Sequence, residues 1–161
     1  MNKTAFPPIV NDASRILILG TMPGERSLEL QQYYGHRGNH FWKIIFTLLN
    51  VPPITDYEEK KRLLLTHHIA LWDVLQACSR EGSADSNIHN EQANDFDHFF
   101  RSHPHITTVF FASGKAEEYY TRYATRRPGI TYMRLPSPSG ANGWMTIDQK
   151  IKEWSAILSY L

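Results

Sequence analysis

The residues best suited to chemistry lie in one short stretch near the start of the chain. This stretch opens with Gly-Thr-Met-Pro-Gly at residues 20–24 and closes with Gly-His-Arg-Gly-Asn-His-Phe-Trp at residues 35–42. Within it, the carboxamide of Asn39 could orient a water molecule through its carbonyl oxygen, but an amide cannot act as a strong general base. The simpler alternative is that Asn39 caps the helix that follows, because Asn is a preferred N-cap residue.

Further candidate side chains follow other apolar runs. Asp73 could accept a hydrogen bond from an N–H group of a ligand, or it could be a capping or turn carboxylate. Tyr34 could stack on a planar ligand, or it could be an ordinary half-buried loop tyrosine. The run Pro-Ser-Pro-Ser-Gly at residues 136–140 combines stiff prolines with hydroxyls that can bond to phosphate oxygens, and such runs are also common in simple turns.

These residues need a scaffold that brings distant strand ends together. Apolar runs predict strands at 15–19, 69–72, 107–112 and 130–135. Helices are expected over about 39–49, 94–102 and 113–124, and Thr55 to Glu58 forms a capping box that opens another helix, which reaches about residue 67. The final helix is predicted from an apolar stripe formed by Ile147, Ile151, Trp154, Leu158 and Leu161. Residues 1–14 and 79–91 are expected to be irregular.

Strands that alternate with helices imply parallel pairing and right-handed crossovers. The sequence therefore predicts an α/β fold, a three-layer α/β/α sandwich with a central sheet of about four parallel strands. All strand carboxyl ends would meet at one edge, where ligands bind in such sheets. That edge would collect the 20–40 stretch, Asp73, Ser113-Gly114 and the 136–143 loop.

The composition fits one globular domain over residues 1–161, with 42% hydrophobic and 20% charged residues. The single cysteine, Cys78, excludes an internal disulfide and argues against an iron–sulfur cluster. No apolar run approaches the roughly 18 residues of a membrane helix, and no signal-peptide core is present, so we expect a cytoplasmic protein. The net charge of +1 decides nothing about nucleic acid, and the arginines between residues 122 and 134 are most simply a solvated surface.

Several site classes are disfavoured by the spacing of the residues they would need. His36 and His40 are four residues apart, but no zincin pattern accompanies them, and no cysteine partners the later histidines. The phosphate-binding P-loop, the dinucleotide glycine motif and the Gly-x-Ser-x-Gly elbow are all absent from the sequence. We therefore expect neither a metal nor a cofactor, and no spacing supports a serine esterase.

Three motifs in matching order resemble the uracil-DNA glycosylase superfamily. They are residues 20–24, the run from Tyr34 to Ile45, and Leu-Pro-Ser-Pro-Ser-Gly-Ala-Asn at 135–142. The middle motif is similar to that of the mismatch-specific uracil glycosylases. Ser27-Leu28 and the run Leu-Trp-Asp-Val-Leu-x-x-Cys at 71–78 make the full pattern most similar to the DNA-deoxyinosine (hypoxanthine-DNA) glycosylase branch.

The resemblance implies a monofunctional enzyme that hydrolyses the N-glycosidic bond of a deaminated base flipped out of DNA, most simply hypoxanthine. It gives Asn39 the catalytic role, Tyr34 that of an aromatic platform and Asp73 that of the base-edge reader. The implied base pocket consists of Gly20, Thr21, Met22, Pro23, Tyr34 and Asp73. The implied DNA-binding residues are Ser113, Ser137, Pro138, Ser139, Gly140 and Asn142.

Two positions depart from the family's usual pattern. Met22 stands where most members carry a water-handling Asp, Glu or Asn, and Leu135 stands where most carry a base-polarising His or Asn. Two alternatives therefore stay open: a uracil or mismatch-specific glycosylase, and a non-catalytic nucleotide- or lesion-binding module on the same fold. The expected partner is DNA containing a deaminated base, with no membrane partner, and the expected state is a monomer.

Overall fold

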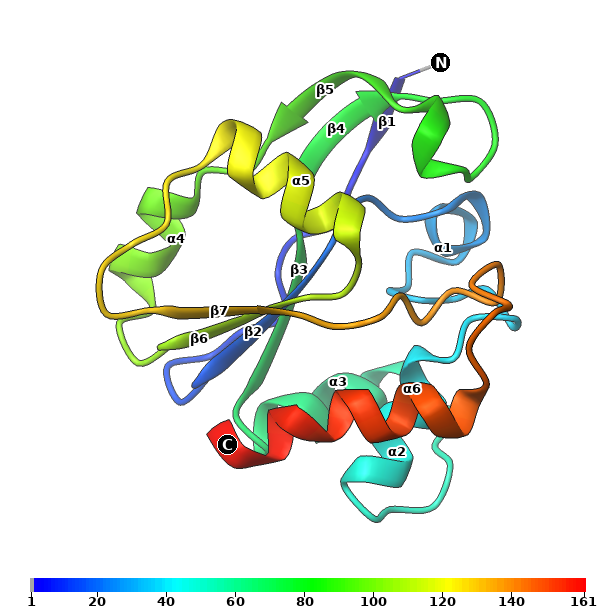
Figure 1. Ribbon diagram of the computed structural model, residues 1–161, viewed down its shortest axis with the longest axis vertical. Helices are drawn as coiled ribbons and strands as arrows, with labels where there is room; N and C mark the ends of the chain where they lie inside the picture. The colour runs from blue at the N-terminus through cyan, green and yellow to red at the C-terminus, as the bar shows by residue number, and fades with distance from the viewer. Residues whose placement is uncertain (1) are drawn as a thin grey trace.

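A four-stranded parallel sheet forms the centre of the computed structural model, which describes residues 2–161 (Figure 1). Its strand order is β3-β2-β6-β7, and every neighbouring pair is parallel. The strands are β2 (Ile16–Gly20), β3 (Ile69–Asp73), β6 (Thr108–Phe111) and β7 (Thr131–Arg134). The predicted parallel sheet is therefore confirmed.

Helices cover both faces of this sheet because alternate residues of a strand point to opposite sides. On β2, Ile16 and Ile18 enter one apolar core, and Leu17 and Leu19 enter the other. The first core lies beneath α2 (Phe41–Leu48), α3 (Tyr57–Thr66) and α6 (Ile147–Trp154). The second lies beneath α4 (Phe96–Ser102) and α5 (Gly114–Tyr123). The three-layer sandwich is thus as predicted (Figure 1).

A second, antiparallel sheet is a correction to the prediction. It consists of β1 (Asn2–Thr4), β4 (Leu75–Ser79) and β5 (His89–Ala93), in the order β1-β4-β5. Residues 1–14 and 79–91 were expected to be irregular, yet both supply strand residues. The run His-Asn-Glu-Gln-Ala of β5 is polar and mostly exposed, so hydrophobic periodicity cannot reveal it. Its pairing with β4 makes it a strand.

Two helix ends and one additional helix also differ from the prediction. The cap of α3 is Asp56, whose carboxylate accepts from the Glu59 N–H at 3.0 Å, so the capping box at Thr55 is wrong by one residue. The last helix ends at Trp154, and residues Ser155–Tyr160 form the 3₁₀ helix η2. A short helix, α1 (Glu25–Leu30), interrupts the stretch expected to be a loop.

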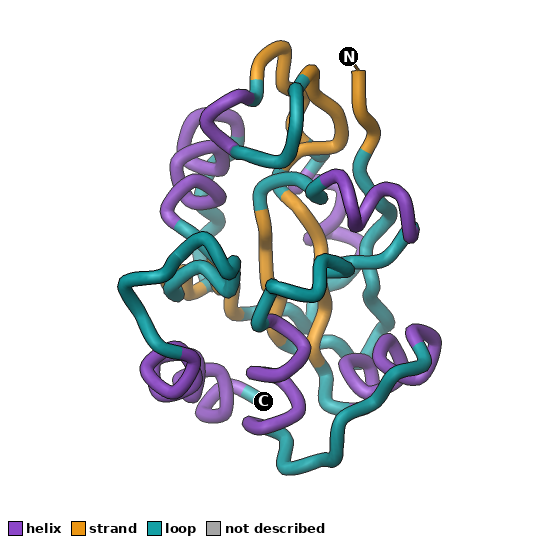
Figure 2. Tube along the Cα trace, turned by 90° about the vertical axis from the view of Figure 1, so that its right-hand side faces the viewer, coloured by secondary structure: helices purple, strands orange, loops and turns teal. Residues whose placement is uncertain are grey.

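The loops at the carboxyl ends of the parallel strands gather at one edge of the sheet. Figure 2, which faces the right-hand side of Figure 1, shows these loops lying over the strand ends. The loop after β7 lies beside the segment that precedes α2, where the His40 N–H donates to the Pro138 carbonyl at 2.8 Å. The 3₁₀ turn η1 (Asp85–Asn87) lies in the connection between β4 and β5. The edge predicted to hold the site is therefore the one where the motifs meet.

Candidate active site

Three predicted pocket residues converge where β2 and β3 end. Gly20 pairs with Asp73 across these strands. A Cβ placed on Gly20 would lie 2.5 Å from Asp73 Oδ1 and 2.9 Å from the Tyr34 hydroxyl oxygen, so only glycine fits there. Tyr34 and Asp73, which are far apart in the sequence, thus both lie close to Gly20 at the strand ends.

Buried polar atoms at this point lack partners in the part of the chain that the structure describes. Asp73 Oδ2 and the Tyr34 hydroxyl are both buried without a hydrogen bond. Such atoms cost free energy unless a ligand or water satisfies them, so they mark a place for polar groups from outside the chain. Burial and, to a lesser extent, the nearby Asp85 charge raise the pKa of Asp73 to about 7, against the opposing effect of the Arg80 guanidinium.

Tyr34 is held in a strained conformation. Its φ is 53°, in the left-handed region that costs a non-glycine residue about 1 kcal/mol or more. One face of its ring stacks on Phe41, with ring centroids 4.1 Å apart and planes 16° apart. Burial raises the pKa of its phenol well above the usual range, so the hydroxyl stays neutral and can donate.

Asn39 lies at the entrance to α2, one residue before the observed cap, His40. Its Oδ1 accepts a hydrogen bond from the Phe41 N–H at 2.9 Å. The capping alternative is therefore close to what the structure shows, with the position of the N-cap corrected by one residue. This bond fixes the carboxamide, leaves a second lone pair on Oδ1, and leaves both Nδ2 hydrogens free. The contact from Phe41 to Tyr34 joins Asn39 to the pocket at the strand ends.

The loop after β7 is braced by its own polar side chains. Ser137 Oγ accepts from the Ser139 N–H at 3.2 Å, and Ser139 Oγ accepts from the Ala141 N–H at 3.1 Å. Asn142 Nδ2 donates to the Ser137 carbonyl at 3.1 Å. A hydroxyl that accepts in this way keeps its own O–H to donate. Both serines can therefore donate to an anion while their positions stay fixed.

Contacts between backbones hold this loop against the segment that carries Asn39. A Cβ on Gly140 would lie 2.5 Å from the Gly38 carbonyl oxygen, so glycine is needed for the close approach. The buried Pro138 accepts from the His40 N–H through its carbonyl. Two motifs that the sequence separates widely therefore form one surface.

Arg80 is a site residue that the sequence reading missed. Its side chain is fully buried: Nη2 donates to the Pro23 carbonyl, and Nε donates to the Gly82 carbonyl at 3.0 Å. Its Nη1 lies 3.5 Å from Asp85 Oδ1. Arg80 thus ties the 20–24 loop to the turn after β4. Arg80 lies within the segment predicted to be an irregular loop, so a charged residue there gives no signal of burial in the sequence.

The comparisons with known proteins agree with this geometry. The model of the uracil DNA glycosylase superfamily matches residues 7–159. The chain belongs to that superfamily. The chain is 38% identical over 162 residues to a Methanosarcina acetivorans protein named hypoxanthine DNA glycosylase, covering 99% of this chain and 100% of that protein. A Methanosarcina barkeri protein of the same name is 36% identical, over 88% of this chain and 89% of that protein.

A solved structure supports the same assignment. It is the solution NMR structure of a Methanosarcina acetivorans protein described as a candidate uracil DNA glycosylase. Its TM-score is 0.85 and its sequence identity 38%, and the match covers 98% of this chain and 96% of that one. The predicted resemblance to the superfamily, and to its hypoxanthine branch, is therefore confirmed.

The two positions that depart from the superfamily's usual pattern both serve the cores. Met22 is buried against the apolar residues beneath α4 and α5, and Leu135 is buried in the core beneath α2, α3 and α6. Thr21 Oγ1 lies 3.4 Å from Ser113 Oγ, and Ser113 also caps α5 by accepting from the Ala116 N–H at 3.1 Å. Within the first motif, Met22 can therefore contribute only its backbone to the site, while Thr21 can contribute a hydroxyl.

Trp144 lies just beyond the motif at residues 135–142, and 82% of its surface is exposed. The other three tryptophans, Trp42, Trp72 and Trp154, are all buried. Tryptophan is enriched at interfaces because it combines a large apolar ring with an N–H donor, so Trp144 is a candidate contact residue. Trp144 lies beyond the residues of the three motifs, so the motifs did not predict a role for it.

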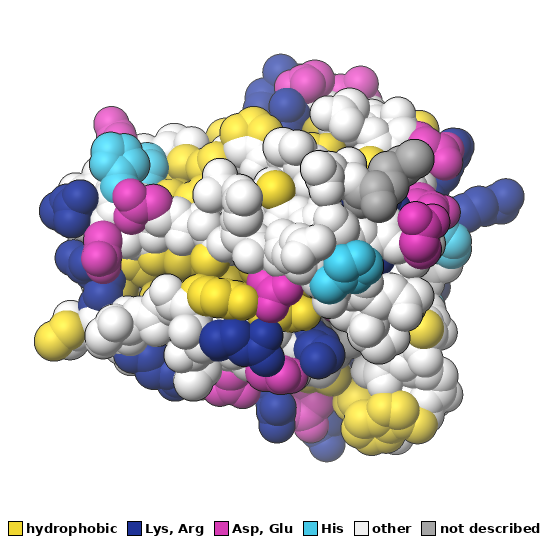
Figure 3. Space-filling view, turned by 90° about the horizontal axis from the view of Figure 1, so that it is seen from above, with side chains coloured by type: hydrophobic (Ala, Val, Ile, Leu, Met, Phe, Trp, Pro, Cys, Tyr) yellow, Lys and Arg dark blue, Asp and Glu magenta, His cyan; other side chains and the backbone are white. Residues whose placement is uncertain are grey.

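The late arginines are surface residues, as the simpler interpretation predicted. Arg122 pairs with Glu91 and Glu118, Arg126 with Glu117, and Arg127 with Asp97. Figure 3 shows Lys and Arg side chains interspersed with Asp and Glu side chains on the face seen from above. These arginines are already neutralised, so they do not form a free basic track.

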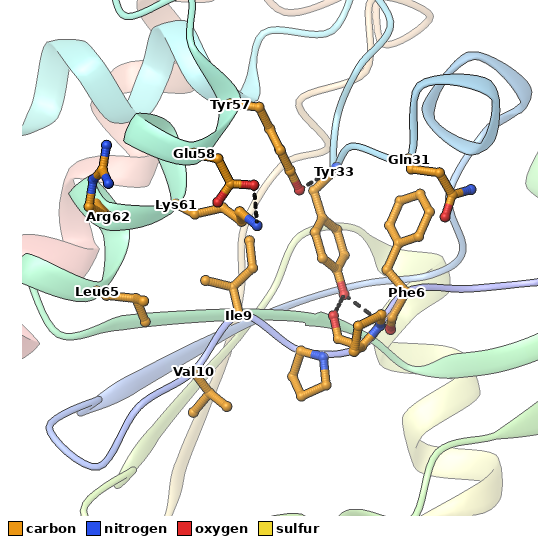
Figure 4. Close-up of a pocket in the computed structure, with 12 residues that line it drawn as sticks. Phe6, Ile9, Val10, Gln31, Tyr33, Tyr57, Glu58, Lys61, Arg62 and Leu65 are labelled. Atoms are coloured by element: carbon orange, nitrogen blue, oxygen red, sulfur yellow. Dashed lines mark hydrogen bonds and ion pairs between the residues drawn. The ribbon is translucent and has the colours of Figure 1, made fainter.

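The hollows found on the molecule lie away from the predicted site. One, of about 490 Å³, lies between the Phe6–Val10 segment and α3, where Tyr33 points toward Phe6 (Figure 4). There the Tyr33 hydroxyl donates to the Pro7 carbonyl at 2.9 Å. Another, of about 520 Å³, is lined by His68, His105 and Tyr160, among others. Neither is lined by Asn39, Asp73 or Tyr34, so neither enters the chemistry below.

No helix within residues 2–161 is long and apolar enough to cross a bilayer. Within the same range, no three His, Cys, Asp or Glu side chains are grouped as metal ligands would be.

Proposed function

We propose that this protein is a monofunctional DNA glycosylase that releases hypoxanthine from deoxyinosine flipped out of DNA. The observation that carries the proposal is the pocket at the ends of β2 and β3, where Asp73 and Tyr34 present buried polar atoms without partners. The names of the two Methanosarcina relatives point to the same base. Flipping costs a few kcal/mol and is easier for a poorly paired base, which suits deoxyinosine.

Base reading would rest on Asp73. As a carboxylate it accepts from the N1–H of hypoxanthine, and it repels adenine, whose N1 is an acceptor. The neutral Tyr34 hydroxyl would donate to an acceptor atom of the base. Backbone N–H groups of the 20–24 loop would take up negative charge on the departing base.

Bond cleavage would rest on Asn39. Rupture of the C1′–N bond passes through an oxocarbenium-like state, as glycoside hydrolysis does. The second lone pair of Asn39 Oδ1 would hold the attacking water and stabilise the cation. Because the Phe41 N–H already fixes this oxygen, little reorganisation is needed when the water attacks.

DNA would be held by the loop after β7. Ser137 and Ser139 would donate to phosphate oxygens, with Ser113 and Asn142 close to the same path and Pro138 and Gly140 setting its shape. Beyond Gly140, the loop would enter the gap left by the flipped nucleotide, with the exposed Trp144 beside it. The expectations of a monomer, of a cytoplasmic location and of one domain over residues 1–161 stay predictions.

The first experiment measures base release from duplex oligonucleotides that carry one inosine, uracil or xanthine, followed by alkali. We expect cleavage of the inosine strand after alkali and an intact strand without it. Preferential release of uracil would instead favour the mismatch-specific alternative. DNA binding without any release would favour the non-catalytic module.

The second experiment separates the two roles of Asn39. Asn39→Ala removes both the helix contact and the carboxamide, while Asn39→Ser keeps an oxygen that can accept from the Phe41 N–H. We expect both variants to lose base release by about 100-fold or more, and the serine variant to melt closer to the wild-type temperature. Wild-type release by Asn39→Ser would reduce Asn39 to a structural cap.

A further inference from the structure

Lys150 is a buried cation on α6, the helix that the sequence predicted from its apolar stripe. It lies on α6 between Ile147, Ile151 and Trp154, and 0% of its surface is exposed. Burying an ammonium costs several kcal/mol unless hydrogen bonds or a counter-ion compensate. Within residues 2–161, no carboxylate lies within ion-pair distance of Lys150. Its position therefore needs a reason other than core packing.

The hydrogen bonds of Lys150 go to the two motif segments. Its Nζ lies 3.2 Å from His40 Nδ1, a residue 110 positions away, and donates to the Ser139 carbonyl at 3.0 Å. One acceptor adjoins Asn39, and the other lies in the loop expected to hold phosphate. Figure 1 shows α6 beginning beneath the loop after β7 and beside α2, against which α6 packs.

Lys150 also fixes the state of the His40 ring. Since the ammonium can donate but not accept, His40 Nδ1 must be the acceptor, and the ring proton of the neutral imidazole then sits on Nε2. Burial lowers the pKa of His40, and the charges of Lys150 and Lys43 lower it further, which keeps the ring in this acceptor form. The hydrogen bond between Lys150 and His40 therefore has one donor–acceptor arrangement.

We propose that Lys150 is a positioning residue that clamps the Asn39–His40 segment to the Ser137–Gly140 loop, so that water and phosphate are presented to one nucleotide together. This rests on the proposed function, but the clamp can be tested without it. The His40 N–H to Pro138 carbonyl bond joins the same two segments and reports on their docking. Loss of Lys150 would leave α6 in place and loosen this bond.

The test compares Lys150→Met with Lys152→Met, an identical change at an exposed position two residues further along α6. Methionine fills similar space, and replacing a buried charge by an apolar side chain is often neutral for stability. We expect Lys150→Met to fold, and to lower the single-turnover rate on inosine duplex at saturating enzyme by about 100-fold, the scale of an ångström-sized misplacement. Lys152→Met should keep the wild-type rate.

Hydrogen exchange by NMR is the second readout. In Lys150→Met, the amide at position 40 should exchange at least about tenfold faster while the amides of α6 stay protected; in Lys152→Met neither should change. A wild-type rate together with unchanged exchange at position 40 would overturn the proposal. If the wild-type protein releases no base, the proposed function fails, and the exchange result alone decides the clamp.

A second variant covers the case in which Lys150→Met does not fold. His40→Ala removes one acceptor of the clamp from the other end and leaves α6 untouched. We expect the same faster exchange at position 40 and a slower single-turnover rate, with near wild-type melting. Wild-type exchange and rate in His40→Ala would reject the clamp.

Discussion

Two buried cations support the two sides of the site, and they do so in different ways. On the strand side, formed by Gly20–Pro23, Asp73, Arg80 and Asp85, the guanidinium of Arg80 faces a carboxylate 3.5 Å away. On the loop side, formed by Gly38–His40, Ser137–Gly140 and Lys150, the ammonium is held by a carbonyl and a ring nitrogen. Under the proposed function, the strand side reads a base and the loop side holds DNA beside a water, and the difference between the two cations suits these roles.

The strand side concentrates charge in a small volume. Burial is the largest cause of the raised pKa at both Asp73 and Asp85, and the Asp85 charge raises the pKa of Asp73 as well. The Arg80 guanidinium opposes the rise at both carboxyls. On the loop side, no carboxylate among residues 2–161 lies within ion-pair distance of the cation, so its field can reach an approaching phosphate. Removing a cation should therefore damage stability on the strand side and rate on the loop side.

The largest loss of stability expected from a substitution comes from Arg80→Met. This change leaves Asp85 without its partner and the Pro23 carbonyl without a donor, which should cost about 3 kcal/mol of unfolding free energy. Urea unfolding measures it, with Arg101→Met, at an exposed position on α4, as the control. Lys150→Met should lose less than about 1 kcal/mol in the same assay. Equal losses for the two variants would remove the distinction between the two sides.

A pH titration of the wild-type protein and of Asp73→Asn tests the role of Asp73 on the strand side. The pKa of Asp73 in the folded protein is about 7, above the ordinary value of 3.8, so ionisation favours the unfolded state. Its contribution to stability is full below about pH 4 and is lost as the pH rises to about 7, by at most about 4 kcal/mol. Base release needs the carboxylate, so activity should rise over the upper part of the same range.

Stability and activity of the wild-type protein should therefore change in opposite directions with pH. In Asp73→Asn both slopes should flatten, and the preference for hypoxanthine over adenine should weaken. The measurements are unfolding free energies and single-turnover rates between about pH 5 and 8. Identical pH profiles in the two proteins would exclude Asp73 from both roles.

The smallest expected effect belongs to Trp144, at the outer end of the loop side. Stacking of an aromatic side chain on a base contributes about 1–3 kcal/mol, so Trp144→Ala should weaken binding to inosine duplex by about tenfold. Because the other three tryptophans are buried, the change in fluorescence on DNA binding should come from Trp144 and vanish in the variant. Unchanged quenching in Trp144→Ala would place DNA elsewhere.

Much of the site could be predicted because its motifs are local. A glycine-rich loop directly after an apolar strand, and Asn39 two residues before the N–H that it accepts from, follow from neighbouring residues. The serines of the 137–139 turn bond to N–H groups two residues ahead for the same reason. Parallel pairing then placed these loops at one edge.

The missed residues share a different property. Arg80 directly follows β4, a strand that composition did not reveal, and Lys150 lies beside an apolar stripe at a position that any surface lysine could occupy. Asp85 lies in a turn within a segment expected to be irregular. Their importance depends on which distant backbone carbonyl or ring lies beside them, and a periodic pattern contains no such information.

The sequence by itself determined the four parallel strands with the helices between them, the motifs, and the family to which the chain belongs. These properties arise from side-chain patterns within a few residues and from the exclusion of apolar surface from water. The tertiary structure decided that Gly20 touches Asp73 and Tyr34, and that Lys150 reaches both His40 and Ser139. The reason is physical: hydrogen bonds and close contacts act over about 3 Å, and packing alone brings residues 110 positions apart within that range.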